Sequence, residues 1–406
     1  MQQGSHNALA ATGALLIVGG GIGGLASALA CAQAGWQVTV LEQAGEFAEF
    51  GAGIQLGPNA VRVLHGWGLA GALAAVAARP AALEVLDAGR GHGLAQLPLG
   101  DAMERQFGAP YLTIARADLQ QVLLAAVRAH PHVALHTGAQ FESYEETRNG
   151  VTVRAGTGEW EAQALVGADG IWSAVRQQLL ADLPPRVSGH LAYRAMVPQA
   201  ELPAPLRLDR VRVWMGPRFH CVQYPVRGGE WLNVVLIVQG AAPHQLQSWD
   251  HSGNQADLLA RLAGAAPALR ALVQSVPHWR LWPLCDRPPM QSAAEHARGR
   301  VALVGDAAHP MRPYLAQGAG MAIEDSATLA RCLGTPRTAG QADPVPLALG
   351  QFAAARWQRN ARVQARAIRN GEIFHFQGAA ALARNGALRV LGARLLALSW
   401  LYAGPP

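Results

Sequence analysis

Charged residues are scarce in this sequence of 406 residues, where Asp, Glu, Lys and Arg together make up 15%. Basic residues number 33 against 27 acidic ones, and the arginines are scattered without any Lys/Arg block. A nucleic-acid-binding protein would need such a block or a basic stripe, so this class is disfavoured. The net charge of +6 suits an anionic cofactor and a small carboxylate substrate, although an arginine-rich genome explains it equally well.

Cysteine is also rare, and the few cysteines show no C-x-x-C spacing. They are Cys31, Cys221, Cys285 and Cys332. No ligand pattern of histidine or acidic residues accompanies them, so we expect neither a metal site nor a disulfide framework. Isolated thiols are typical of a reducing compartment, which predicts a cytoplasmic protein.

Long apolar runs are missing as well. The run at 14–18 is too short for a membrane span or a signal peptide and lacks a basic region before it. Residues 1–12 are expected to form a loose tail. The apolar segment 387–401 is interpreted as a helix docked on the body of the protein rather than on a membrane surface. With 50% hydrophobic residues the chain is able to bury a large core, and its length predicts two or three domains.

What the chain does contain is a glycine-rich turn after a short apolar strand. Gly19, Gly21 and Gly24 follow residues 14–18 at G-x-G-x-x-G spacing, and a helical pattern of Leu25, Leu29 and Ala30 comes next. The first glycine allows the turn, the second lets a pyrophosphate approach the backbone, and the third lets the helix pack on the strand. The helix N-terminus then offers free N–H groups to phosphates.

A second strand, residues 37–41, ends at Glu42 and Gln43. Glu42 lies 18 residues after Gly24, close to the spacing at which a carboxylate binds a ribose hydroxyl. A glycine-rich turn arising by chance is the alternative, and the flanking strands and helix argue against it. At this point the dinucleotide is either a nicotinamide or a flavin nucleotide.

The remaining chain mixes short strands with long helices. Residues 81–111 are expected to be irregular after a strand-like start, and residues 334–349 to form a connector. The expected strands are 139–145, 150–155, 159–163, 164–167 and 300–304. A separate antiparallel sheet is expected to contain the strands 190–197, 210–215, 219–226 and 231–238. The expected helices are 116–130, 255–275, 318–333 and 350–371.

Two further loops follow buried strands, the position where α/β folds bind ligands. Residues 167–176, with Asp169 and Arg176, resemble the "DG" motif of flavoprotein monooxygenases. Residues 305–320, with Asp306, resemble their "GD" motif. Together with the Gly19 turn, these motifs make the chain similar to the single-component (group A) FAD-dependent aromatic hydroxylases, which have the p-hydroxybenzoate hydroxylase fold.

The resemblance implies a fold of class α/β + β. A Rossmann-like FAD-binding domain would be built from the discontinuous segments 13–80, 112–183 and 285–345. An antiparallel-sheet substrate domain would comprise 81–111 and 184–284, and C-terminal helices would occupy 346–406. The N-terminal turn would then hold FAD, bound tightly and without a covalent link.

The family's cofactor contacts carry over to matching positions. Glu42 would bind the ribose, Arg116 the pyrophosphate and Asp306 the ribityl chain, whereas for Asp169 and Arg176 a structural role is as well supported as direct contact. A helix starting near Gly318 would aim its N–H groups at the flavin pyrimidine edge. The implied FAD residues are Gly19, Gly21, Ile22, Gly23, Gly24, Glu42, Gln43, Gly53, Arg116, Asp169, Asp306, Pro313, Gln317, Gly318, Ala319 and Gly320.

Catalysis in such enzymes hydroxylates an aromatic ring with NAD(P)H and O₂ through a flavin C4a-hydroperoxide. The segment 218–225 resembles the active-site strand of 3-hydroxybenzoate 6-hydroxylases and 6-hydroxynicotinate 3-monooxygenases. Its His220 and Tyr224 are four residues apart and face the same side of a strand, and either suits deprotonation of a phenol. A purely structural histidine is the alternative. Pro313 matches the residue whose carbonyl lies near the oxygen-carrying flavin carbon.

The substrate is less well specified. The loop 309–318 looks closer to the hydroxynicotinate enzymes, but Tyr314 stands where their pattern has histidine. Arg312 is a candidate for pairing with a carboxylate, and a solvated loop arginine is the alternative. The expected substrate is a small aromatic acid of the hydroxybenzoate, salicylate or hydroxynicotinate type. A larger polycyclic or antibiotic substrate, or a flavoprotein reductase, is the alternative, and the sequence leaves a homodimer open.

Overall fold

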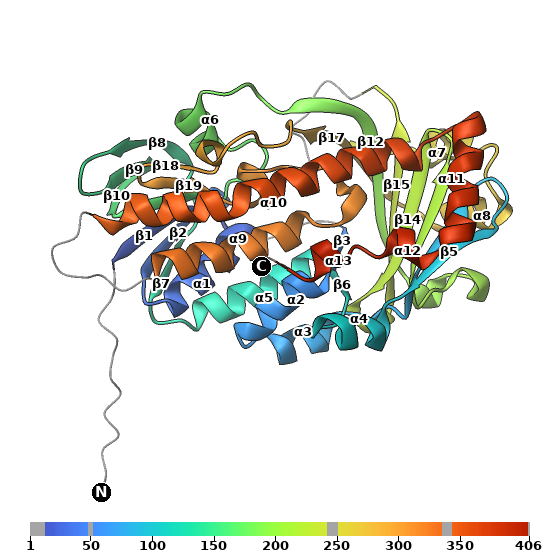
Figure 1. Cartoon of the computed structure of the whole chain (residues 1–406), viewed down its shortest axis with the longest axis horizontal. Coiled ribbons are helices and arrows are strands. Elements are labelled where there is room, and N and C mark those ends of the chain that lie inside the picture. The colour runs from blue at the N-terminus through green and yellow to red at the C-terminus, as the bar shows by residue number, and fades with distance from the viewer. Residues whose placement is uncertain (1–12, 48–51, 242–250, 335–342, 405–406) are drawn as a thin grey trace, which may run out of the picture.

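The structure is a computed structural model that describes residues 13–47, 52–241, 251–334 and 343–404. Two β-sheets at opposite ends of the molecule face one another across its middle, and one long helix runs along both (Figure 1). Within the described residues, no helix is both long enough and apolar enough to cross a membrane.

The first sheet has six strands in the order β18-β19-β11-β1-β2-β7. Its strands pair in parallel except at the edge, where β18 and β19 are antiparallel. Segments far apart in sequence thus build one sheet, as expected for a discontinuous Rossmann-like unit. Its strands are β1 (Ala14–Val18), β2 (Gln37–Leu41), β7 (Val133–His136), β11 (Ala164–Gly167), β18 (Ala297–Arg298) and β19 (Val301–Leu303).

Apolar layers cover both faces of this sheet. On one face Leu15 and Ile17 pack in a core to which three helices, among others, contribute, and on the other Leu16 and Val18 pack with a three-stranded antiparallel sheet. This alternation follows from the period of two along a strand. The helices are α1 (Ile22–Gln33), α5 (Arg116–Arg128) and α9 (Gly318–Leu333), and the small sheet comprises β8 (Phe141–Glu146), β9 (Val151–Ala155) and β10 (Gly158–Ala162).

The second large sheet has eight strands in the order β16-β17-β12-β15-β14-β13-β4-β5. It is antiparallel except for the parallel pair β4–β13. The prediction that 81–111 is mostly irregular was wrong, because this stretch supplies the last two strands at one side of the sheet and a helix. The elements are β4 (Ala82–Asp87), β5 (Gly93–Pro98), α4 (Gly100–Phe107), β12 (Arg186–Pro198), β13 (Val211–Gly216), β14 (Phe219–Val226), β15 (Trp231–Gln239), β16 (His251–Gly253) and β17 (Trp279–Asp286).

The two faces of this sheet have different neighbours. Leu191, Tyr193 and Cys221 pack with α7 (Gln255–Arg261) and α8 (Pro267–Ser275) on the outer face. Ala192 lies on the inner face, which is turned toward the six-stranded sheet, and packs with Tyr314. Between the sheets lie β3 (Gly53–Leu56), α2 (Pro58–Gly66), α3 (Ala70–Val76) and β6 (Leu112–Ala115), whereas α6 (Ala174–Leu180) packs near β8 at the end that carries the six-stranded sheet.

The C-terminal helices connect the two ends. The helix α10 (Pro344–Phe374) begins earlier than the predicted 350, because the Asp343 side chain caps it by accepting a hydrogen bond from the N–H of Val345. Its 31 residues span about 46 Å. The last helices are α11 (Gly378–Leu391), α12 (Ala393–Leu396) and α13 (Ser399–Tyr402).

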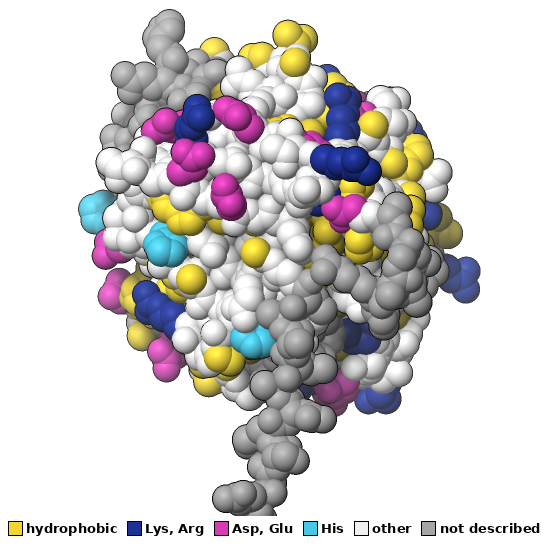
Figure 2. All heavy atoms as spheres, turned by 90° about the vertical axis from the view of Figure 1, so that its left-hand side faces the viewer, with side chains coloured by type: hydrophobic (Ala, Val, Ile, Leu, Met, Phe, Trp, Pro, Cys, Tyr) yellow, Lys and Arg dark blue, Asp and Glu magenta, His cyan; other side chains and the backbone are white. Residues whose placement is uncertain are grey.

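The end of the molecule that carries the six-stranded sheet has no continuous basic surface in view. Figure 2 shows basic and acidic side chains interspersed over the described residues of this face. A nucleic-acid backbone would require a concentrated positive field, and this end of the molecule does not present one.

Candidate active site

The glycine turn after β1 is built so tightly that side chains are excluded from it. Gly19 has a positive φ of 107°, and a Cβ there would overlap the carbonyl group of Ala168. A Cβ on Gly24 would overlap the carbonyl oxygen of Gly19, so this glycine allows α1 to pack on the strand. The helix α1 starts after Gly21 without any side-chain cap. Its first N–H groups and positive dipole end therefore suit a pyrophosphate.

Glu42 lies at the same turn, as the spacing predicted. Its Oε2 accepts a hydrogen bond of 2.7 Å from the N–H of Gly20, and its Oε1 accepts one of 2.9 Å from Ala44. These bonds fix the carboxylate beside the glycine turn, and its contact with a ribose stays a prediction. Gln43 follows with its side chain exposed to solvent.

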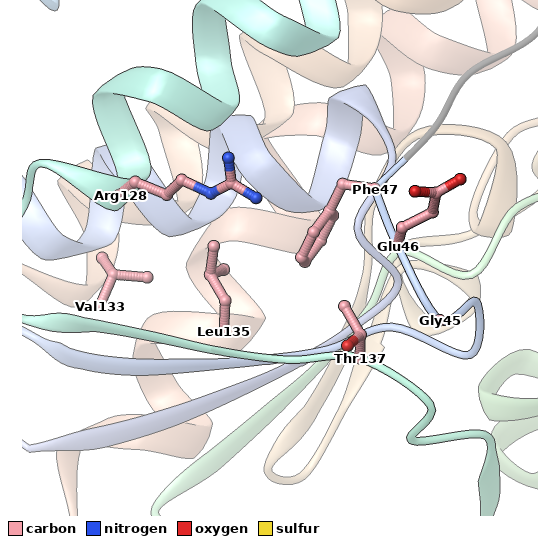
Figure 3. A pocket seen from close by; sticks show the side chains of 7 residues that line it. All are labelled: Gly45, Glu46, Phe47, Arg128, Val133, Leu135 and Thr137. Atoms are coloured by element: carbon pink, nitrogen blue, oxygen red, sulfur yellow. The ribbon is translucent and has the colours of Figure 1, made fainter.

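A hollow of about 480 Å³ is lined in part by residues 45–47, which follow Glu42 closely in the chain (Figure 3). Phe47 and Arg128 project into it from two sides, and Leu135 and Thr137 come from β7 and the residue that follows it. It lies beyond the end of β2, on the side of the turn where the adenosine end of a dinucleotide would extend.

The two other predicted loops are joined by one arginine. Arg176 on α6 donates hydrogen bonds from Nη1 to the carbonyl oxygens of Ala307 and Ala308, at 3.2 and 2.6 Å. Asp169 accepts bonds from Ser173 and from the N–H groups at the start of α6. Both side chains thus make structural contacts, and direct contact of Asp169 with a cofactor stays a prediction.

The third loop ends at the N-terminus of α9. Asp306 is exposed, and a Cβ on Gly318 would lie 3.9 Å from its Oδ1, so the two border the same open space. Gln317 precedes the helix without capping it, because its Oε1 accepts a bond from Asn59 instead. The helix therefore directs uncapped N–H groups along Ala319 and Gly320 toward the space between the sheets. Pro313 is exposed in the turn that leads there.

Directly behind this loop lies a buried ionic network. The Nε of Arg356 donates to Oδ1 of Asp325 at 2.8 Å, and its Nη1 donates to Oε2 of Glu324 at 2.7 Å. His309 lies 2.5 Å from the other oxygen of Asp325. Burial raises the pKa of the Asp325 carboxyl, but the neighbouring His309 and the guanidinium of Arg356 outweigh this effect and lower the pKa overall.

Part of this network has the spacing of a metal site, although none was predicted. Ligand atoms of His296, His309 and Asp325 all lie within 4.8 Å of one another. A metal cation there would meet the positive charge of Arg356, which already bonds the same carboxylate. We therefore interpret the cluster as a structural support for the loop at 305–310.

On the inner face of the eight-stranded sheet, His220 and Tyr224 both lie buried on β14, as predicted. His220 is part of a cluster of aromatic side chains. Its Nδ1 lies 2.8 Å from Nε2 of His375, the residue that directly follows α10. His190 Nδ1 is hydrogen-bonded to the hydroxyl of Tyr314, whose ring contacts His220 with centroids 5.0 Å apart.

All three histidines of this cluster are held neutral by their surroundings. Burial lowers the pKa of His190 to about 4 and that of His375 to about 3. Burial, reinforced by the neighbouring histidines, also lowers the pKa of His220 well below its usual value. A neutral imidazole has a free lone pair, so His220 is able to accept a hydrogen bond from a hydroxyl group at neutral pH.

Tyr224 lies further along the same strand in a separate group of polar side chains. It contacts Gln55, whose Oε1 also accepts a 2.7 Å bond from the hydroxyl of Tyr111. The N–H of Gly53 donates a 2.6 Å bond to Oδ1 of Asn233, and a Cβ on Gly53 would lie 2.8 Å from the Tyr224 ring. The glycine thus permits this close packing of β3 on the sheet.

The two arginines near this space differ in their pairing. Arg312 does not remain a solvated loop side chain, because its Nε donates a 2.6 Å bond to Asp286, whose side chain is 1% exposed. Arg194 on β12 stacks on the ring of Trp282, 4.9 Å from its centroid. The sequence interpretation had considered only Arg312.

Comparison with known proteins agrees with this geometry. The family described as "FAD binding domain" matches residues 12–364 of the chain. The chain belongs to this family of FAD-dependent monooxygenases.

Relatives of this monooxygenase act on aromatic acids. The 3-hydroxybenzoate 6-hydroxylase of Klebsiella oxytoca is 37% identical over 373 residues, 91% of either chain. The 6-hydroxynicotinate 3-monooxygenase of Bordetella bronchiseptica is 35% identical over 321 residues, 78% of this chain and 82% of that one. A salicylate hydroxylase in complex with its substrate has a TM-score of 0.80 at 26% identity, covering 96% of this chain and 95% of that chain.

The cofactor of this monooxygenase is FAD, and the chain's own residues suit it. The uncapped N-termini of α1 and α9, the fixed carboxylate of Glu42 and the exposed carboxylate of Asp306 offer donors and acceptors in an order that matches an extended dinucleotide. Arg116 begins α5, where its N–H donates to the carbonyl oxygen of Ala52. Its contact with the pyrophosphate stays a prediction.

Several residues near the monooxygenase's substrate space were not predicted. Strand alternation would have placed Arg194 on the same face as Ala192, so its signal was available in the sequence. His375 carries no such signal, because it comes from the end of a helix that only the tertiary fold brings to β14. His190, Gln55 and Tyr111 likewise follow from the packing of distant elements.

Proposed function

We propose that the protein hydroxylates a small aromatic acid that carries a ring hydroxyl group, or the aza-analogue of such an acid, at the expense of NAD(P)H and O₂. The observation that supports this most directly is the pair His220–His375 on the inner sheet face. It supplies a buried, neutral base at a strand that also carries Tyr224. FAD, once bound and reduced, supplies the activated oxygen.

The chain's own residues provide the remaining functions. Nε2 of His220 accepts the proton of the substrate's ring hydroxyl, which makes the ring electron-rich and able to attack an electrophilic oxygen. The donation of Nδ1–H to His375 holds His220 in the tautomer that this task requires. The hydroxyl of Tyr224 orients the ring, and the uncapped N–H groups of α9 stabilise negative charge that develops on the cofactor.

Water is kept away from the reacting atoms by apolar side chains on both sides. Ala192 and Ile237 cover the sheet side, and Tyr314 and Phe374 close the space from the loop and from α10. Exclusion of water strengthens the electrostatic interactions and suppresses the wasteful release of hydrogen peroxide.

We also propose the remaining assignments made from the sequence. The substrate-binding part comprises 81–111 and 184–284, the FAD-binding part comprises 13–80, 112–183 and 285–345, and the protein works in the cytoplasm. All four cysteines are free thiols, as a reducing compartment favours.

The decisive experiment uses the purified holoenzyme with a panel of aromatic acids. Stimulation of NAD(P)H oxidation by one of them, with one hydroxylated product formed per NAD(P)H consumed, is the expected result. Complete conversion of the reducing equivalents to hydrogen peroxide with every acid would contradict the proposal. Turnover only with polycyclic phenols would instead favour the alternative substrate class.

A further inference from the structure

Arg194 is a largely buried cation that faces the space between the two sheets. Its neighbours on β12 define the faces, since Leu191 and Tyr193 pack in the outer core and Ala192 packs with Tyr314 on the inner side. Because side chains alternate between the two faces of a strand, Arg194 lies on the same inner face as Ala192. The side chain stacks on Trp282 with its guanidinium carbon 4.9 Å from the ring centroid.

This guanidinium has no acidic partner among the residues that the structure describes. Its Nε is buried, and the N–H there donates to no acceptor among these residues. Burial accordingly lowers the pKa of Arg194 to about 10. By contrast, the buried Arg356 has two carboxylates and the buried Arg176 bonds Asp182 at 2.7 Å. Since an unpaired buried charge is costly, its retention here suggests an anionic ligand.

The strand register places this guanidinium within one small molecule's length of the proposed catalytic side chains. Arg194 pairs with Val235, and Val235 pairs with Val222, which lies between His220 and Tyr224 on β14. Two strand spacings separate Arg194 from Val222, about 10 Å between Cα atoms. The guanidinium stacks on Trp282 of the adjacent strand β17 and also interacts electrostatically with Tyr224, so it lies close to the proposed site.

We propose that Arg194 binds the carboxylate of the aromatic acid and thereby sets both its orientation and the enzyme's preference for acids. This inference rests on the proposed function. Arg312, the other candidate, is already bonded to Asp286 at 2.6 Å and is not available. A guanidinium binds a carboxylate through two parallel hydrogen bonds, so the anchored ring would present its hydroxyl group to His220 in one orientation.

The test measures binding separately from turnover. Benzoate and benzamide carry no ring hydroxyl, so their dissociation constants, measured from the perturbed absorbance of the flavin in the holoenzyme, report on the anchor alone. Arg194→Met is expected to weaken benzoate binding by about 10- to 100-fold. Benzamide binding should change by less than about threefold, and Arg194→Lys should recover part of the benzoate affinity.

Arg186→Met provides the matched control, since Arg186 lies on the same strand and its side chain is 52% exposed. In this variant Asp286, the partner of Arg186, still forms its ion pair with Arg312, so benzoate binding should not change. Equal losses for benzoate and benzamide in Arg194→Met would overturn the proposal, because they indicate a structural role. A raised KM for NAD(P)H with unchanged benzoate binding would also overturn it, because the anion would then be a phosphate.

The same measurements separate this inference from the proposed function. Benzoate binding that depends on Arg194, without stimulation of NAD(P)H oxidation by any hydroxylated acid, would refute the function and retain the anchor. Product formation from an aromatic acid with the same KM in wild type and Arg194→Met would retain the function and refute the anchor. Failure of wild type to bind benzoate at millimolar concentration would refute the anchor as well.

Discussion

The Nδ1 of His220 lies 2.8 Å from the Nε2 of His375, although 155 residues separate the two in the chain. One nitrogen of the pair must donate and the other must accept, so the tautomer of one ring determines that of the other. When His220 donates to His375, its second nitrogen is left as an acceptor for a substrate proton. The end of α10 thus controls which form of the base is present.

Replacement of His375 should slow hydroxylation without weakening substrate binding. His375→Ala removes the acceptor that orients His220, and a loss of about 10- to 100-fold in kcat is expected at nearly constant KM. Rapid-mixing kinetics of the holoenzyme with a hydroxylated acid would measure this. His278→Ala, at an exposed position, is the control. An unchanged kcat would show that His375 does not position the base.

Replacement of His220 itself should have a larger effect and separate reduction from hydroxylation. His220→Ala removes the base, and product formation should fall by about 10²- to 10⁴-fold. NAD(P)H oxidation should continue and yield hydrogen peroxide, because the residues assigned to the cofactor are untouched. The ratio of product to peroxide measures the effect, and full coupling in this variant would rule out His220 as the base.

Acidification should destabilise the protein through its buried histidines. The pKa of His296 is lowered to about 4, like that of His190, whereas an unfolded chain binds a proton near pH 6.5. Because the unfolded state then binds more protons, stability falls as the pH drops from about 6.5 toward 4. Between pH 7 and 5 each such histidine should cost on the order of 1–2 kcal/mol.

Urea unfolding of the holoenzyme at several pH values would measure this dependence. His190→Gln should make the slope shallower, and an exposed substitution such as His278→Gln should leave it unchanged. A stability that rises on acidification would contradict the assignment of neutral buried histidines.

Loss of the buried guanidinium behind the GD loop should be severely destabilising. Arg356→Leu leaves Asp325 and Glu324 buried with fewer partners, and a loss of about 3–5 kcal/mol in the free energy of unfolding is expected. Arg154→Leu, which removes an exposed pair with Glu145, should cost less than about 1 kcal/mol. Similar values for the two variants would show that the buried network contributes little.

Two adjacent glycines offer a matched test of the first turn. Gly24→Ala would place a Cβ into the carbonyl oxygen of Gly19, so a loss of about 2–3 kcal/mol or more is expected, together with loss of flavin. At Gly23 the nearest atom to a Cβ is 3.6 Å away, an ordinary contact. Thermal unfolding of Gly23→Ala should therefore resemble wild type. Equal destabilisation by both would contradict the packing argument.

The sequence was most informative where local chemistry determines structure. The turn at Gly19–Gly24 and the position of Glu42 follow from backbone sterics and short-range spacing, and the three loops could be recognised because each follows a buried strand. The alternation along β14 correctly placed His220 and Tyr224 on one face. These features depend on neighbours within a few residues.

Other features depend on contacts that no local pattern encodes. Residues 81–111 gave only weak strand signals, because β4 is stabilised by pairing with β13, far away in sequence, and β5 forms the edge of the sheet beside β4. The start of α10 was misplaced because Pro344 and Pro346 suggested a connector, whereas Asp343 caps a helix there. The pairing of Arg312 with Asp286, and that of His375 with His220, required the fold.

The continuity of α10 makes its length a fixed spacer. Arg356 binds the network behind the cofactor loop, and His375, at the end of the same helix, contacts the base on the opposite sheet. One residue inserted between them would turn His375 by about 100° around the helix axis and move it away from His220. Substitutions at exposed positions such as Ala365 should be tolerated, but insertions and deletions should not. Exchange of this helix between related enzymes therefore requires the same number of residues between Arg356 and His375, even at positions where the residue type does not matter.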